Sequence, residues 1–192
     1  KYSINSIACN EKLNEFISID IYGNIKVWDL QNNFNFQTIN LNEAVSTQTN
    51  KKLSSNQKMI LLKKANKIFT YGEKLMMFNK ETLSLPDLTD NQSILGCIYR
   101  DTKYELITIC LKKIQVWNIF NGKIIKLFDK FSSNFNSEIT SFCTGFSNKK
   151  LYIGDSYGGI TCLDLNNGKI IATLDNHTDE VISLKHSNKN TL

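Results

Sequence analysis

IQVWNIFNGKIIKLF, at Ile114–Phe128, has a near copy further along the chain, ITCLDLNNGKIIATL at Ile160–Leu174. In both copies a short run of alternating apolar and polar residues leads to an Asn-Gly pair and then to a second apolar run. Asn and Gly readily supply the positive φ angles of a tight hairpin turn. Each copy therefore predicts two strands joined by a turn, and the pair of copies indicates a repeat protein.

Bulky residues mark the same place in four units of the chain. They end the third apolar run of each unit and recur about every 40 to 50 residues: Trp28, Phe78, Trp117 and Leu163. The residue that follows each of them is acidic or an amide: Asp29, Asn79, Asn118 and Asp164. A complete unit has four short runs of β-type alternation, so we expect four-stranded antiparallel sheets and an all-β fold.

The unit boundaries follow from these runs. We expect the first unit at 1–41, the second at 58–90, the third at 91–129 and the fourth at 138–175. Residues 176–192 begin a fifth unit, with an opening strand at Glu180–Lys185, so the chain is expected to be a fragment of a longer protein. Between the units, 42–57 is a polar insertion expected to form a surface loop, and 130–137 is a shorter loop. The second unit is the most degenerate, because Pro86 weakens its last strand.

The composition limits the classes of partner. The net charge of +5 comes almost wholly from lysine, since Arg100 is the single arginine. Nucleic-acid sites favour the planar fork of arginine, so the composition does not favour a nucleic-acid partner. Five cysteines without a CxxC pair are expected to be free thiols in a reducing, intracellular compartment. No apolar run approaches the ~20 residues of a membrane span, so no membrane contact is expected.

Residues that carry catalysis or bind metals are scarce. The two histidines, His177 and His186, have no cysteine or carboxylate at metal-ligand spacing. The glycine-rich run Gly154–Gly159 sits at a strand-to-strand turn and lacks the helix that a phosphate loop needs. We therefore predict no catalytic residue, no metal, no cofactor and no enzymatic activity.

The period and the Trp-Asp ending resemble the WD40 repeats of β-propellers. The similarity rests on GNIKVWDL (Gly23–Leu30), KIQVWN (Lys113–Asn118) and DNHTDEVISL (Asp175–Leu184), in which His177 holds the histidine position of the family. The resemblance implies a partial WD40-type β-propeller of about four four-stranded blades plus the start of a fifth. Each blade buries both faces against its neighbours, so the repeats are obligatory.

The chain departs from the family in its polar residues. In the family, Trp, Ser or Thr, His and Asp form a buried hydrogen-bond network, with Asp just before the glycine that enters the third strand. Here that place holds Tyr22 and Tyr157, and about Lys112 in the third unit. Two nearby acids, Asp20 and Asp155, are not expected to substitute. Trp28 and Trp117 are therefore expected to stabilise the fold mainly by burial.

The resemblance implies a non-catalytic scaffold that binds several other proteins in a large complex. A narrower similarity, to the large WD-repeat proteins of ciliary axonemes, rests on the Phe-rich loop, the E-I-T strand and the N-N-G turn between Leu127 and Leu174. It implies a structural, microtubule-associated subunit in the cytoplasm or cytoskeleton, and in the cilium in particular.

Two other classes of WD40 protein stay open. A ubiquitin-ligase substrate receptor usually carries arginine two positions after the Trp-Asp pair, where this chain has Gln31, Phe120 and Asn166. A ribonucleoprotein or RNA-processing propeller would carry basic, aromatic-rich loops, and the single arginine counts against it.

The loop between the third and fourth units holds the candidate partner contacts. It carries Phe131 and Phe135 between polar residues. Exposed there, the two rings would be natural anchors for a partner protein. The alternative is that one of them fills the space between the two units.

Overall fold

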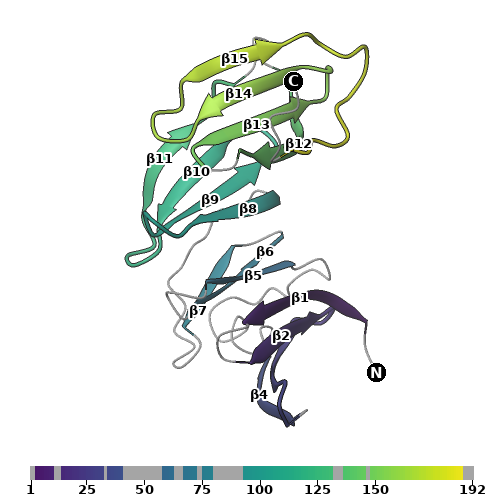
Figure 1. Cartoon of the computed structure of the whole chain (residues 1–192), viewed down its shortest axis with the longest axis vertical. Coiled ribbons are helices and arrows are strands. Elements are labelled where there is room, and N and C mark those ends of the chain that lie inside the picture. Colours follow the sequence, from purple (N-terminus) through teal and green to yellow (C-terminus); the bar gives the residue numbers. More distant parts are fainter. Residues whose placement is uncertain are drawn as a thin grey trace.

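The computed structural model describes residues 3–10, 14–32, 34–40, 58–62, 67–72, 75–79, 93–131, 136–145 and 148–187. Within these ranges the chain forms fifteen strands and no helix (Figure 1). The prediction of an all-β fold is confirmed. The polar insertion 42–57 and Pro86 lie outside the described residues, so the predictions made for them stay predictions.

The strands form four sheets in chain order, and neighbouring strands in each sheet are antiparallel. Sheet 1 contains β1 (Ile4–Asn10), β2 (Glu15–Asp20), β3 (Asn24–Asp29) and β4 (Phe34–Asn40). Sheet 2 contains β5 (Lys58–Leu62), β6 (Lys67–Tyr71) and β7 (Met76–Asn79). Sheet 3 contains β8 (Ile94–Arg100), β9 (Glu105–Cys110), β10 (Ile114–Asn118) and β11 (Ile124–Phe128). Sheet 4 contains β12 (Ile139–Thr144), β13 (Lys150–Asp155), β14 (Ile160–Asp164) and β15 (Ile170–Leu174).

The four sheets are stacked face to face, from sheet 1 in purple to sheet 4 in green and yellow (Figure 1). Each pair of neighbours encloses one apolar cluster made of residues from both. The cluster between sheets 1 and 2 includes Ile17, Ile25, Met59 and Ile68. The cluster between sheets 2 and 3 includes Phe69, Met77, Leu106 and Trp117. The cluster between sheets 3 and 4 includes Ile107, Val116, Leu151 and Leu163.

The inner strand β9 shows why no sheet can stand alone. All six of its residues are buried. Side chains alternate between the two faces of a strand. Leu106 and Cys110 therefore pack toward sheet 2, whereas Ile107 and Ile109 pack toward sheet 4. Burial of each such side chain stabilises the fold by about 1.5 to 3 kcal/mol, and neighbours on both sides are needed to obtain it.

The two Asn-Gly segments form the hairpins that the sequence predicts. Gly122 and Gly168 have φ angles of 65° and 73° and supply the positive φ of each turn. Both hairpins also have a register shift after the third residue of the inner strand, between Val116 and Trp117 and between Cys162 and Leu163. Such bulges twist an edge strand and re-aim its side chains. The outer strands of both hairpins are the edge strands of their sheets, and they expose several apolar side chains to solvent.

The expected strand at Glu180–Lys185 is wrong: the structure has no strand there. A strand exists only where another strand supplies hydrogen-bond partners, and none of the described strands pairs with this segment. Its backbone nevertheless occupies the place of a first strand. The Val181 N–H donates to Asp155 O at 3.1 Å, as Ile94 and Ile139 donate to the carbonyls of Gly72 and Leu111 at the starts of β8 and β12.

Candidate protein-interaction surface

The two tryptophans differ in burial and share a hydrogen bond. Trp117 is buried between sheets 2 and 3, and its indole N–H donates to Thr108 Oγ1 at 2.9 Å. Trp28 is half-buried and donates to Ser18 Oγ at 3.0 Å, while its ring stacks on Phe16 with a centroid distance of 5.4 Å. Each tryptophan therefore makes a hydrogen bond in addition to the burial that the sequence predicts. A hydroxyl on the neighbouring strand satisfies each indole N–H, and such a bond contributes about 1 kcal/mol.

The acids at the turn between the second and third strands form the same contacts in sheets 1 and 4. Asp20 Oδ1 accepts the N–H groups of Tyr22 and Asn24 at 2.9 Å each. Asp155 Oδ1 accepts those of Tyr157 and Gly159 at 2.9 Å and 2.8 Å. Both acids thus close a turn whose tip presents a tyrosine. These acids are structural, which sequence reasoning had not expected, although the shared spacing Asp-x-Tyr-Gly is a signal that could have shown it.

The last residue of the third strand closes the turn between the third and fourth strands in three of the sheets. Asp29 Oδ1 accepts the Gln31 N–H at 2.7 Å. Asn118 Oδ1 accepts the Phe120 N–H at 2.8 Å, and Asp164 Oδ1 accepts the Asn166 N–H, also at 2.8 Å. This acid or amide therefore has one role in three sheets. It satisfies a backbone donor at the start of the turn.

The stack of sheets has two opposite edges where strands turn, and different bonds join neighbouring sheets at each edge. The connection edge holds the turns between second and third strands, at 20–24, 111–113 and 155–159, and the links to the next sheet. Here a backbone N–H that begins one sheet donates to a carbonyl at the end of the second strand of the sheet before. Ile94 donates to Gly72 O at 2.9 Å, and Ile139 donates to Leu111 O at 2.7 Å.

The hairpin edge is the opposite edge, with the turns at 101–104, 119–123 and 165–169. Here cations of one sheet donate to carbonyls of the next. Lys67 Nζ of sheet 2 donates to Ile119 O of sheet 3 at 2.7 Å. Lys126 Nζ of sheet 3 donates to Asn166 O of sheet 4 at 2.5 Å. Each of these neighbouring pairs of sheets is therefore joined by bonds on the hairpin edge as well as on the connection edge.

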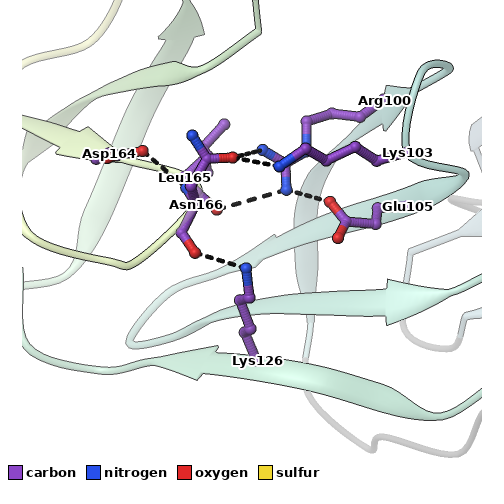
Figure 2. Close-up of polar contacts among 7 residues, drawn as sticks. All are labelled: Arg100, Lys103, Glu105, Lys126, Asp164, Leu165 and Asn166. Carbon is purple, nitrogen blue, oxygen red and sulfur yellow. Dashed lines mark hydrogen bonds and ion pairs between the residues drawn. The ribbon is translucent and has the colours of Figure 1, made fainter.

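Arg100 is the centre of the bonds between sheets 3 and 4 (Figure 2). Its guanidinium pairs with the Glu105 carboxylate within sheet 3, and the arginine side chain is 4% exposed. It also donates to Leu165 O at 3.5 Å and to Asn166 Oδ1 at 3.2 Å in sheet 4. Lys103 Nζ reaches the same Asn166 Oδ1 at 2.6 Å. The single arginine of the chain is thus an internal link between sheets and is withdrawn from solvent.

The comparisons with known proteins fit this geometry. No family model matches the chain. The crystal structure of the Cps50 (Swd1) beta-propeller domain of Myceliophteria thermophila superposes with a TM-score of 0.70 at 11% sequence identity, over 95% of this chain and 58% of that one. This chain has a β-propeller fold. The chain is also 26% identical, over 182 residues, to cilia- and flagella-associated protein 337 B of Tetrahymena thermophila. That match covers 95% of this chain and 14% of the length of the relative.

In propeller terms, each sheet is a blade, and two of the predicted repeat positions differ from the tryptophans. Leu163 is fully buried between the third and fourth blades, where it takes the place of a tryptophan. Phe78 lies on β7 opposite Ile68, and its side chain lies outside the described residues. His177 is exposed, and its backbone N–H donates to Gly158 O at 2.9 Å. The histidine segment is therefore fixed to the propeller through its main chain.

The predicted partner contacts have different outcomes. Phe131 is 4% exposed and packs in the cluster between the third and fourth blades. For Phe131 the structure supports the alternative that it fills the space between the two blades, and it corrects the expectation of an exposed anchor. Its ring belongs to the same buried cluster as Ile139 and Leu165, so its apolar surface is removed from water. Phe135 lies outside the described residues, so its role stays a prediction.

The described part of the propeller has few groups suited to chemistry. Among its residues, no three His, Cys, Asp or Glu side chains are placed to hold a metal ion. It also has no helical segment with the length and hydrophobicity that a bilayer crossing requires. Its five cysteines are free thiols, and burial raises the pKa of Cys97 well above its ordinary value. A thiol of raised pKa is a poor nucleophile.

Proposed function

We propose that this chain is a non-catalytic WD40-type scaffold and part of a structural subunit in a large protein assembly, with the ciliary axoneme as its site. The observation that carries the proposal is the similarity over 95% of the chain to a protein named as cilia- and flagella-associated. The chain spans 14% of that relative. The partners and the microtubule association of the whole protein therefore belong to the proposal.

The way the blades are joined supports a scaffold. Bonds on the connection edge and on the hairpin edge hold the second, third and fourth blades in a fixed relation. A rigid array of blades presents its turns at constant spacing, which is what a platform for several proteins requires. The non-catalytic part of the proposal rests on the propeller fold, whose repeats commonly serve as binding surfaces.

The two alternatives receive less support from the geometry. An RNA-binding propeller would need accessible cations, and arginine above all. Here Arg100 is buried and paired with Glu105. A ubiquitin-ligase receptor would carry arginine after the Trp-Asp pair, yet Asn166 at that place already accepts bonds from Arg100 and Lys103.

A localisation and extraction experiment tests the proposal. The full-length protein that contains this chain is tagged in ciliated cells, and its cilia are isolated and extracted with detergent. We expect the protein to remain with the axonemal microtubules, while a matched free tag is lost. Recovery of the protein only from the soluble cytoplasm would overturn the ciliary proposal. Binding of RNA that falls steeply with salt would favour the ribonucleoprotein alternative.

A further inference from the structure

The third blade carries aromatic residues at two places on the hairpin edge where the first blade carries the amides Asn14 and Gln31. In the first and third blades the residue directly before the second strand has a left-handed backbone, Asn14 with φ 49° and Tyr104 with φ 53°. In the fourth blade the left-handed residue is Asn148, with φ 49°, one position before the matching residue Lys149. Asparagine accepts this conformation readily, whereas it is unfavourable for a tyrosine. A strained tyrosine at this turn needs another reason to be there.

An aromatic residue also replaces an amide in the other turn of the hairpin edge, between the third and fourth strands. Phe120, Gln31 and Asn166 occupy matching places, each with its N–H bonded to the acid or amide two residues before it. The backbone of the turn therefore forms equally well around a polar side chain. Phe120 is nevertheless 65% exposed, so neither turn geometry nor core packing accounts for its ring.

The two aromatic residues touch each other at the surface. The rings of Tyr104 and Phe120 lie 5.2 Å apart between centroids and are tilted by 48°. Tyr104 is 40% exposed. Isolated exposed apolar side chains are ordinary on protein surfaces, but a preformed aromatic pair presents a rigid apolar contact area. Tyr and other aromatic residues in such positions are frequent anchors of protein interfaces.

One lysine lies against the pair, and two others belong to the same turns. Lys67 of the second blade lies with its Nζ 6.0 Å from the centroid of the Phe120 ring and is held there by its bond to Ile119 O. Lys123 is exposed at the end of the Phe120 turn, and Lys103 is exposed in the Tyr104 turn. The one acid in these turns is Asp101. The surface around the rings is therefore positively charged and apolar at once.

We propose that the Tyr104–Phe120 pair and the lysines around it form a docking surface for an acidic, apolar segment of a partner protein. An apolar side chain of that segment packs on the two rings, and its carboxylates lie against Lys67 and Lys123. The charge of the surface selects an acidic occupant. The small area of two rings suits a short extended segment more than a folded domain. This inference rests on the proposed scaffold function, because it names the kind of partner that one surface of the scaffold binds.

The test measures binding of a labelled peptide of alternating glutamate and phenylalanine to the purified full-length protein by fluorescence anisotropy. Phe120→Gln installs the side chain that the first blade has at this place. We expect it to weaken binding roughly tenfold, which corresponds to about 1.4 kcal/mol. Phe34→Gln is the matched control, because Phe34 is 63% exposed on the outer strand of the first blade. This control should leave the affinity unchanged.

A second pair of variants tests the charge. Lys123→Glu should weaken binding of the same peptide, whereas Lys169→Glu, at the matching place in the fourth blade, should not. A peptide of alternating lysine and phenylalanine should bind far more weakly than the acidic one. Equal effects of the two phenylalanine variants or of the two lysine variants would overturn the proposal, as would equal binding of the two peptides. Binding of oligo(U) in preference to the acidic peptide would assign the surface to single-stranded RNA instead.

The peptide assay is independent of where the protein resides in the cell. If the protein were found outside cilia, a positive peptide result would still support the docking surface, on a scaffold in another compartment. A protein that remains on axonemes but shows no preference for the acidic peptide would remove the docking surface alone. The unfolding midpoint of each of the four variants should lie within a few degrees of the wild type, because exposed substitutions rarely alter stability. A change in peptide affinity then comes from the altered surface.

Discussion

Replacing Glu105 with glutamine is expected to destabilise the propeller by about 3 kcal/mol. Glu105 supplies the carboxylate that neutralises Arg100, whose side chain is 4% exposed. Breaking a buried ion pair from one side costs about 3 to 5 kcal/mol, because a charge stays in the interior without compensation. The lower end applies here, since Leu165 O and Asn166 Oδ1 remain as acceptors.

A double variant separates this explanation from simple loss of packing. Changing both residues to apolar ones of similar size, as Arg100→Met and Glu105→Leu, should restore stability to within about 1 kcal/mol of the wild type. Urea unfolding followed by tryptophan fluorescence gives the free energy of unfolding of each variant. If Glu105→Gln cost less than about 1 kcal/mol, or if the double variant were less stable than the single one, the buried pair would not be the link that Figure 2 shows.

Three further changes probe other parts of the fold. Thr108→Val should cost about 1 to 3 kcal/mol in urea unfolding, because the buried Trp117 indole loses its acceptor; Ser18→Ala, beside the half-buried Trp28, should cost less, because water can replace the hydroxyl. Gly158→Ala should lower the unfolding midpoint strongly, since φ is 83° and the added Cβ would lie 2.2 Å from His177 O, whereas Gly145→Ala meets no neighbouring atom closer than 3.7 Å and should be tolerated. Burial, and after it the nearby Cys97, raises the pKa of Tyr71 from 10.0 to about 12. The folded state therefore holds the phenol proton more tightly than the unfolded state, so the stability that Tyr71 contributes is present below pH 10 and is lost as the pH rises toward 12. Tyr71→Phe should flatten this loss when the free energy of unfolding is measured against pH.

Much of the fold was predictable because strand alternation and hairpin turns are local. The twin stretches at Ile114–Phe128 and Ile160–Leu174 became β10–β11 and β14–β15, with glycine at the positive φ of each turn. The place of Trp117 in an inter-blade cluster followed from the repeat. These features depend on the order of residues along one blade, and sequence carries that order directly.

The contacts between blades were not predictable in the same way. The link from Arg100 to Asn166 joins residues from two blades, and nothing in the local pattern of either turn specifies it. The burial of Phe131 likewise depends on contacts with residues from two blades. The failure at Glu180–Lys185 has a related cause, because alternation alone predicts a strand and pairing decides whether it forms.

The sequence did carry one signal for the hairpin edge that pattern analysis did not use. Comparing matching turns among the units would have shown Tyr104 and Phe120 where the first unit has Asn14 and Gln31. Such a comparison looks for departures from the repeat. The search for periodicity looks for agreement with it, and so passes over them.

The two edges of the propeller also differ in how they tolerate divergence. The bonds that recur between sheets on the connection edge join main-chain atoms, such as the Ile139 N–H and Leu111 O, and an ion pair of Lys112 with Glu138 lies beside them. A main-chain bond of this kind does not depend on which side chain either of its residues carries. The hairpin edge depends on particular cations, so each change alters how blades meet and what they display. A duplicated ancestor could therefore keep its geometry through one edge while its copies acquired separate partners through the other.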